Sequence, residues 1–200
     1  RAAWKTYVGR PESDNIRCFA LELLGCSIRQ SGQVLGTAEA LHLEKGTEAL
    51  PVLEAALALR RRYYCHAEDC ILGAQNGLAN CFDCLERHDE ALVLRREIYT
   101  RRVATLGVSH YDYDTITSGR NLSLSLVKLK RWDEAKSFAR KLLPVAQQSL
   151  GADDDASLAL NMLLAGALWG NPECTRKDLL EAETILQDVI QRRRRVFGPA

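Results

Sequence analysis

The sequence predicts an all-α fold, a right-handed solenoid of stacked antiparallel helix pairs. One observation is an internal repeat: Asp89-Glu-Ala91 returns 44 residues later as Asp133-Glu-Ala135, and Gly107 returns at the same distance as Gly151. A fixed period between about 20 and 50 residues is typical of repeat arrays. A second observation is the composition, because the 200 residues are 46% hydrophobic but only 6% aromatic. Such an alanine- and leucine-rich chain favours helices over strands.

Within each repeat the apolar residues recur every three or four positions, which is the helical period. Helices are expected, in chain order, over 14–27, 28–43, 47–64, 68–86, 89–106, 112–130, 133–150, 154–170 and 177–197. Asp89 and Asp133 stand where a second helix needs an N-cap, and Gly107 and Gly151 where that helix should end. The sequence therefore predicts an irregular helical cap over 1–45 and an array over 46–200, with repeats of about 42–47 residues.

Small residues recur where the two helices of a repeat should approach each other. Ala79 and Ser123 are equivalent positions of first helices, and Ala91 and Ala135 are equivalent positions of second helices. A small side chain at a helix contact lets the two backbones come close and pack densely. We therefore expect these four residues to be buried between paired helices.

Charge and cysteine content limit the kinds of partner and the cellular compartment that we expect. The net charge is +1, from 27 basic and 26 acidic residues, which gives no field that favours nucleic acid. No apolar run approaches the roughly 18 residues that a membrane span needs. Seven cysteines, an odd number, predict reduced thiols and an intracellular protein, cytoplasmic or organellar. We expect the native N-terminus to be missing, because the chain begins at Arg1, so a targeting segment is not observable.

The repeats resemble the tetratricopeptide repeats of the kinesin light chain type. The matching segments are Leu106-Gly-Val-Ser-His110, Asp114-Thr-Ile-Thr-Ser-Gly-Arg-Asn-Leu-Ser123 and Lys130-Arg-Trp-Asp-Glu-Ala135. The resemblance extends over 68–198. HEAT and armadillo repeats have overlapping lengths, but Asp-Glu-Ala after the turn and Leu-Gly after the second helix favour tetratricopeptide repeats. The resemblance implies an interaction scaffold and implies no catalysis.

By this resemblance, the first helix of each repeat lines a concave groove. The residues expected to bind a partner there are Asn76, Asn80, Asp83, Arg120, Asn121, Leu124, Lys128, Asn161, Met162 and Trp169. Asparagine amides can donate to and accept from a peptide backbone, and the two cations favour acidic residues. Leu158 and Leu168 are expected to add apolar surface. The predicted function is therefore a non-catalytic scaffold or adaptor for a protein or peptide with acidic and bulky apolar residues.

Two other classes of function stay open. One is a structural or accessory subunit, docked in a large multiprotein assembly through its convex face and loops. The other is a regulatory or catalytic polypeptide that contains this array. No nucleophile, phosphate-binding loop or carboxylate pair has the spacing of a catalytic motif, so we expect no enzyme activity and no cofactor from this segment.

Cysteines and arginines form two further clusters. Cys65, Cys70, Cys81, Cys84 and His88 are zinc-type ligands. The repeat explains their helix without a metal, because the equivalents of Cys81 and Cys84 are ordinary exposed types, Ser125 and Lys128. We expect no metal, with zinc or a redox pair as alternatives. The arginine runs Arg60–Arg62, Arg95–Arg96, Arg101–Arg102 and Arg192–Arg195 fall on second helices. They are expected to be solvated cations that complement the helix dipole, with RNA binding as the alternative.

Overall fold

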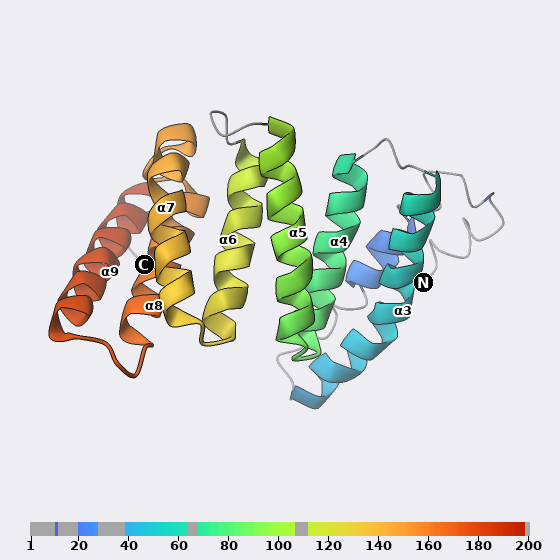
Figure 1. Cartoon of the computed structure of the whole chain (residues 1–200), viewed down its shortest axis with the longest axis horizontal. Coiled ribbons are helices and arrows are strands. Elements are labelled where there is room, and N and C mark those ends of the chain that lie inside the picture. The colour runs from blue at the N-terminus through green and yellow to red at the C-terminus, as the bar shows by residue number, and fades with distance from the viewer. Residues whose placement is uncertain (1–10, 12–19, 28–38, 64–67, 107–111, 199–200) are drawn as a thin grey trace. The chain divides into compact units, whose positions relative to one another are not determined.

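The computed structural model describes residues 11, 20–27, 39–63, 68–106 and 112–198. A short helix covers 20–27. The longer helices are α3 (Glu39–Tyr63), α4 (Glu68–Cys84), α5 (His88–Leu106), α6 (Tyr113–Lys128), α7 (Trp132–Leu150), α8 (Asp155–Trp169) and α9 (Arg176–Phe197). No strand occurs in these ranges (Figure 1). The predicted all-α fold class is confirmed, and the six helices expected from residue 68 onward agree with α4–α9 within two residues at each end.

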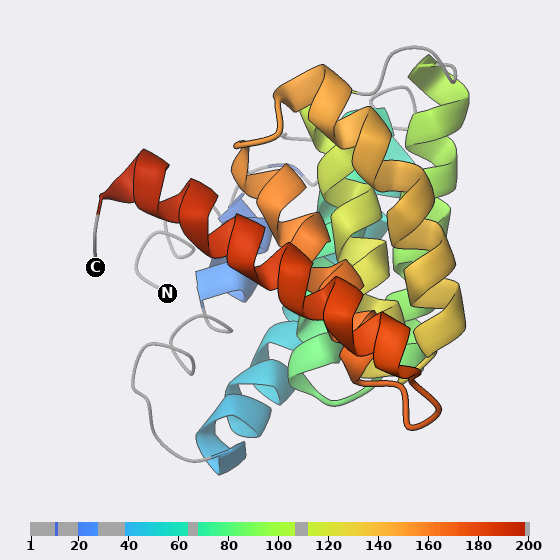
Figure 2. The same ribbon diagram turned by 90° about the vertical axis from the view of Figure 1, so that its left-hand side faces the viewer.

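The chain divides into two compact halves, Arg1–Leu94 and Arg95–Ala200. In the N-terminal half, α3 packs against α4, and the first turns of α5 join the same core. In the C-terminal half, α8 contacts α6, α7 and α9, and α6 also contacts α7. Figure 2 shows α9 as the foremost helix, in front of α7 and α8. The first helices α6 and α8 contact each other and form one layer, and ion pairs link the second helices α7 and α9 as another layer.

The turns inside the repeats have the same geometry in both halves. Glu86 follows α4 with φ of 58°, and Lys130, its equivalent after α6, has φ of 57°. The next amides, of Arg87 and Arg131, donate to carbonyls of the preceding helices at 2.9 Å. Each turn is thus closed by a left-handed residue and backbone hydrogen bonds, as in αL helix ends.

The expected N-caps Asp89 and Asp133 are wrong, and the tight turns explain why. Each turn needs only one left-handed residue before the next helix, so α5 begins at His88 and α7 at Trp132. Arg131 is the N-cap residue of α7 and makes no side-chain capping bond, so Asp133 lies in the first turn. Gly151 ends α7 with φ of 100°, as expected of a glycine stop, whereas Gly107 lies outside the described residues.

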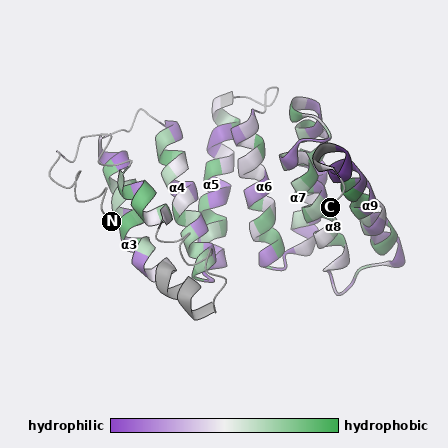
Figure 3. Ribbon diagram, turned by 180° about the vertical axis from the view of Figure 1, so that it is seen from behind, coloured by the Kyte–Doolittle hydropathy of each residue, from purple (hydrophilic) through white to green (hydrophobic). Residues whose placement is uncertain are grey.

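Small residues lie at the helix contacts, as predicted. Ala79, Ser123, Ala91 and Ala135 are all fully buried. The core of the N-terminal half gathers Leu53, Leu78, Phe82 and other apolar residues of α3 and α4 around Ala79 and Ala91. Hydrophobic and hydrophilic residues both occur along the helices (Figure 3), and buried and exposed residues are interspersed along α4–α9.

Upstream of α4 the expected helices are partly wrong. We predicted a break near residues 44–46 between two helices, but α3 runs without interruption from Glu39 to Tyr63. Gly46 lies inside α3 because α3 and the end of α4 approach closely there. A Cβ at Gly46 would lie 2.8 Å from Leu85 Cδ2, and Cys81 Sγ donates to the Gly46 carbonyl at 3.3 Å. The predicted boundary at 45–46 falls within α3, and most of the expected helix over 28–43, like residues 12–19, lies outside the described residues.

Candidate partner-binding surface

In the C-terminal half, the outward side of the α6–α8 layer is the candidate binding surface. Both helices bury one side against the second-helix layer and against each other, so their remaining sides face away from α7. The predicted site residues on these remaining sides are Arg120, Asn121, Leu124, Lys128, Met162 and Trp169, which we call the α6–α8 surface. The structure thus gathers six of the ten predicted residues into one layer.

The α6 part of this surface is basic. Arg120 and Lys128 are eight residues apart, so they lie on one side of the helix and are separated by roughly 12 Å along its axis. The Arg120 guanidinium donates to Asn121 Oδ1 at 3.2 Å, while Leu124 lies between the two cations and is half-buried. The two cations can therefore attract carboxylates on either side of Leu124, and we call this part of α6 the basic strip.

The α8 part is apolar and unusually open. Trp169 is 62% exposed and Met162 is 42% exposed, and their spacing of seven residues puts them on one side of α8. Between them lies Gly166, where the atom nearest to an added Cβ would be Trp169 Nε1 at 4.0 Å. Exposed aromatic and thioether groups beside a small residue suit contact with a bulky apolar side chain.

Three predicted residues belong to the N-terminal half. Asn76 and Asn80 are half-buried on α4. The Asp83 carboxylate is mostly buried and bonds His88 Nδ1 at 2.9 Å, so part of its bonding capacity is used within its own turn. These three residues form a separate candidate patch on α4 of the N-terminal half.

Some predicted apolar surface is core instead. Leu158 and Leu168 are fully buried, so their expected exposure is wrong, and Asn161 is only 7% exposed. Leu168 packs with Ala139 of α7 and Ala182 of α9, because α8 contacts three neighbouring helices and has only a narrow open side. Asn161 therefore offers little atom area to a partner.

Arg95 is predicted to be a solvated cation, but it lies buried against α6 and supports the α6–α8 surface through hydrogen bonds to that helix. It is only 3% exposed, and its Nη1 donates to Ser125 Oγ at 2.6 Å and to the Asn121 carbonyl at 3.2 Å. Its repeat equivalent, Ala139, is also buried. A small apolar residue at the equivalent position is the sequence signal that could have predicted the burial of Arg95. The expectation that Ser125 is exposed is wrong, because Ser125 is buried against Arg95.

Arg60 also departs from the predicted solvated arginines. It is buried in the N-terminal half and its guanidinium meets the Glu22 carboxylate at 2.6 Å. The partner explains the burial, because a buried cation requires a compensating charge or hydrogen bond. Neither buried arginine is therefore available to RNA.

The cysteine cluster shows no metal geometry within the described residues. No group of three or more His, Cys, Asp or Glu side chains there is placed to hold a metal ion. Five cysteines of the described ranges form no disulfide, namely Cys26, Cys70, Cys81, Cys84 and Cys174, and Cys65 lies outside the described residues. Cys81 is buried and spends its S–H on the Gly46 carbonyl, which is a packing role.

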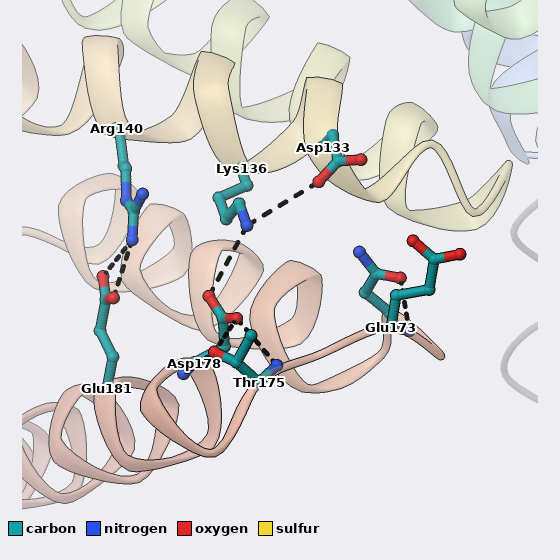
Figure 4. A network of polar contacts seen from close by, with 8 residues as sticks. Asp133, Lys136, Arg140, Glu173, Thr175, Asp178 and Glu181 are labelled. Atoms are coloured by element: carbon teal, nitrogen blue, oxygen red, sulfur yellow. Dashed lines mark hydrogen bonds and ion pairs between the residues drawn. The ribbon is translucent and has the colours of Figure 1, made fainter.

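Second helices are joined by ion pairs on the opposite layer (Figure 4). Lys136 Nζ lies 3.6 Å from Asp178 Oδ1 and 3.8 Å from Asp133 Oδ1. Thr175 caps α9: its hydroxyl donates to Asp178 Oδ2 at 2.6 Å and accepts from the Asp178 amide. Hydrogen bonds donated to the Asp178 carboxylate, chiefly by the Thr175 hydroxyl and then by the Thr175 amide, hold the pKa of Asp178 below its ordinary value. The network fixes α9 against α7.

Comparison with known proteins agrees with this architecture. A tetratricopeptide-repeat model matches residues 115–155 and 173–200. Two crystal structures of a Podosopora anserina putative kinesin light chain with nearly identical TPR-like repeats superpose with TM-scores of 0.72 and 0.70. Each is 18% identical, and they cover 97% and 96% of this chain and 82% of their own. BtubC (BKLC) from P. vanneervenii gives 0.54 at 14% identity, covering 89% of this chain and 74% of its own. Comparison with curated protein sequences gives no match.

The helix pairs, their repeated turns and these neighbours define an all-α repeat protein. The predicted resemblance is confirmed at the level of the fold: a tetratricopeptide-repeat model matches two segments of the chain, and its helices are arranged like the TPR-like repeats of a putative kinesin light chain. Such repeats are generally non-catalytic scaffolds that present extended surfaces to protein partners. In the described ranges no helix is both long and apolar enough to cross a membrane.

Proposed function

We propose that the chain is an intracellular, non-catalytic scaffold, and that its α6–α8 surface holds a peptide segment of a partner protein. The observation that carries the proposal is the pairing of an exposed apolar patch, Met162 and Trp169, with a basic strip on the adjacent first helix. The described cysteines form no disulfide with one another, which supports a reducing compartment.

The chemistry of the surface specifies the segment. Arg120 and Lys128 complement carboxylates, and Arg120 can make a bidentate contact. Trp169 offers an indole face with an N–H at its edge, a combination that is enriched at the energetic centres of interfaces. The expected ligand carries one or more acidic residues beside a single bulky apolar residue.

Selection from a random-peptide library on the immobilised chain tests this function. We expect the enriched peptides to share an acidic residue near a bulky apolar one, and to be lost when selection is repeated on Trp169→Ala. Lys141→Glu, an exposed change on α7 in the other layer, is the control and should select the same peptides. Enrichment that is indifferent to Trp169→Ala would contradict the proposal.

A second candidate is a subunit that docks in a large assembly through its second helices. One observation favours it: α9 leaves Leu179, Leu180, Leu186 and Ile190 exposed. In that case the Trp169→Ala protein would still assemble, whereas substitutions on α9 would release it.

A further inference from the structure

One side of α9 carries an apolar stripe that nothing in the described chain covers. Leu179, Leu186 and Ile190 are 46%, 37% and 50% exposed. Steps of seven and four residues align these three side chains along one side of the helix. The buried side of α9 is distinct from this stripe and is formed by Ala182, Val189 and half-buried Ile185. α9 is therefore apolar on two sides.

The repeat frame identifies the residues of α7 that are equivalent to the stripe of α9. Glu134-Ala135 of α7 returns 47 residues later as Glu181-Ala182 of α9. In the same frame Trp132, Ala139 and Leu143 of α7 correspond to Leu179, Leu186 and Ile190 of α9. The α7 residues of this set are the ones that the next repeat covers.

The α7 contacts show how that cover is made. Ala139 is 1% exposed and packs against Leu164, Ala165 and Leu168 of α8. Leu143 joins the same cluster, and the Trp132 ring lies 2.9 Å from where a Cβ of Gly170 would be. The α7 side is thus a stacking face, occupied by the first helix of the following repeat.

Charges at the end of α9 indicate the orientation of a helix that would cover the stripe. Arg192 and Arg193 pair with Asp153 and Asp155 at the start of α8, at 3.0 and 3.4 Å. The next two residues, Arg194 and Arg195, are exposed and have no ion pair in the described part of the chain. They suit a second acidic helix start on the other side of α9.

The same kind of pairing already occurs between successive repeats. Arg102 near the end of α5 lies 3.5 Å from Asp114 in the first turn of α6, and α6 is the first helix of the following repeat. An acidic first turn is also favourable for the helix that carries it, because it complements the positive end of the helix dipole.

We propose that the stripe of Leu179, Leu186 and Ile190 is a stacking face for one further helix. That helix runs antiparallel to α9, has an acidic first turn that pairs with Arg194 and Arg195, and presents small and apolar residues to the stripe. This is the chemistry of α8, so the occupant is the first helix of a further repeat of the same kind. Leu186 replaces Ala139, so the incoming helix must be small at that contact.

The test extends the chain in register. Residues 152–198 are added again after Gly198, so that Gly198 takes the place of Gly151 and the copied α8 can reach the stripe. We expect a gain in helical circular dichroism and a melting temperature several degrees above that of the original chain. An extension that adds neither helix nor stability would overturn the proposal.

A matched set of variants then locates the contact. Leu186→Gln with Ile190→Gln should leave the original chain nearly unchanged, because both side chains are exposed, but should cancel the gain in the extended chain. Leu180→Gln changes an exposed leucine on another side of α9 and should have the same small effect in both. Equal effects of the double variant in the two chains would overturn the proposal.

Two further outcomes are decisive. Arg194→Glu with Arg195→Glu should reduce the gain of the extended chain in low salt, and an undiminished gain would refute the charge pairing. Sedimentation of the original chain tests a rival occupant. A dimer that the Leu186→Gln and Ile190→Gln double variant dissociates would show that a second copy covers the stripe, and would overturn the proposed helix. A monomer is the expected result.

Discussion

Arg140 on α7 meets both carboxylate oxygens of Glu181 on α9, each at 2.7 Å (Figure 4). The same pair occurs one repeat earlier, where Arg96 of α5 bonds Glu134 of α7. Arg96 and Arg140 are 44 residues apart, and Glu134 and Glu181 are 47 apart. The ion pair therefore recurs at the same place between successive second helices, and at α9 the residue equivalent to Arg140 is Gln187.

Breaking the later pair should cost little, because both side chains are well exposed. In a double-mutant cycle of Arg140→Ala and Glu181→Ala, urea unfolding should give a coupling free energy of about 0.2–1 kcal/mol that declines in high salt. A coupling above about 2 kcal/mol, unaffected by salt, would show that the pair is shielded from solvent, contrary to the structure.

Ala135→Leu should destabilise the α6–α7 pair. Ala135 is 1% exposed, so extra methylenes must displace packed neighbours, at a cost of roughly 1–3 kcal/mol in the free energy of unfolding. The control is Ser137→Leu, which adds a similar volume at an exposed position of the same helix. Equal melting temperatures for the two variants would contradict the close helix contact.

Arg95→Met should be costly although an arginine is replaced by an apolar residue. It leaves the buried Ser125 Oγ without the guanidinium donor that bonds it, and an unsatisfied buried acceptor costs about 1–3 kcal/mol. Adding Ser125→Ala should recover part of the loss, because it removes one orphaned acceptor. If Arg95→Met unfolds at the wild-type urea concentration, Arg95 has no supporting role.

Asp178 should make the stability of α9 depend on acidity. Hydrogen bonds from Thr175 hold its pKa below the ordinary value, so its ionised form stabilises the fold above the unfolded pKa of about 3.9. That contribution is lost as the pH falls through the lower folded pKa. The difference in melting temperature between wild type and Asp178→Asn should therefore be present at pH 7 and should shrink in acid. A difference that grows in acid would reverse the sign of the pKa shift.

The parts of the fold that depend on local pattern could be predicted from the sequence. Helices α4–α9 follow the 3.6-residue period, and the small residues Ala79 and Ala135 mark close helix contacts. The continuity of α3 could not be predicted, because Gly46 resembles a turn residue and its role depends on Leu85, which is distant in sequence.

The candidate site was predictable in composition but not in exposure. Met162 and Trp169 are open, while Leu158 and Leu168 on the same helix are core, because α8 contacts three other helices and the sequence period alone does not count its neighbours. Arg95 was missed for a similar reason: a charged residue on a second helix suggests solvent unless its buried partners are known.

A peptide titration measures whether the α6–α8 surface binds the partner segment. Fluorescence polarisation of a library-selected peptide would give its Kd for wild type, Arg120→Glu, Trp169→Ala and the control Lys141→Glu, each checked for helicity. We expect Arg120→Glu and Trp169→Ala each to weaken binding at least about fivefold, because the first reverses a local charge and the second removes an aromatic anchor. Lys141→Glu should leave the Kd unchanged. If Lys141→Glu weakens binding while Arg120→Glu and Trp169→Ala leave it unchanged, the partner segment binds the second helices and the proposed function is wrong.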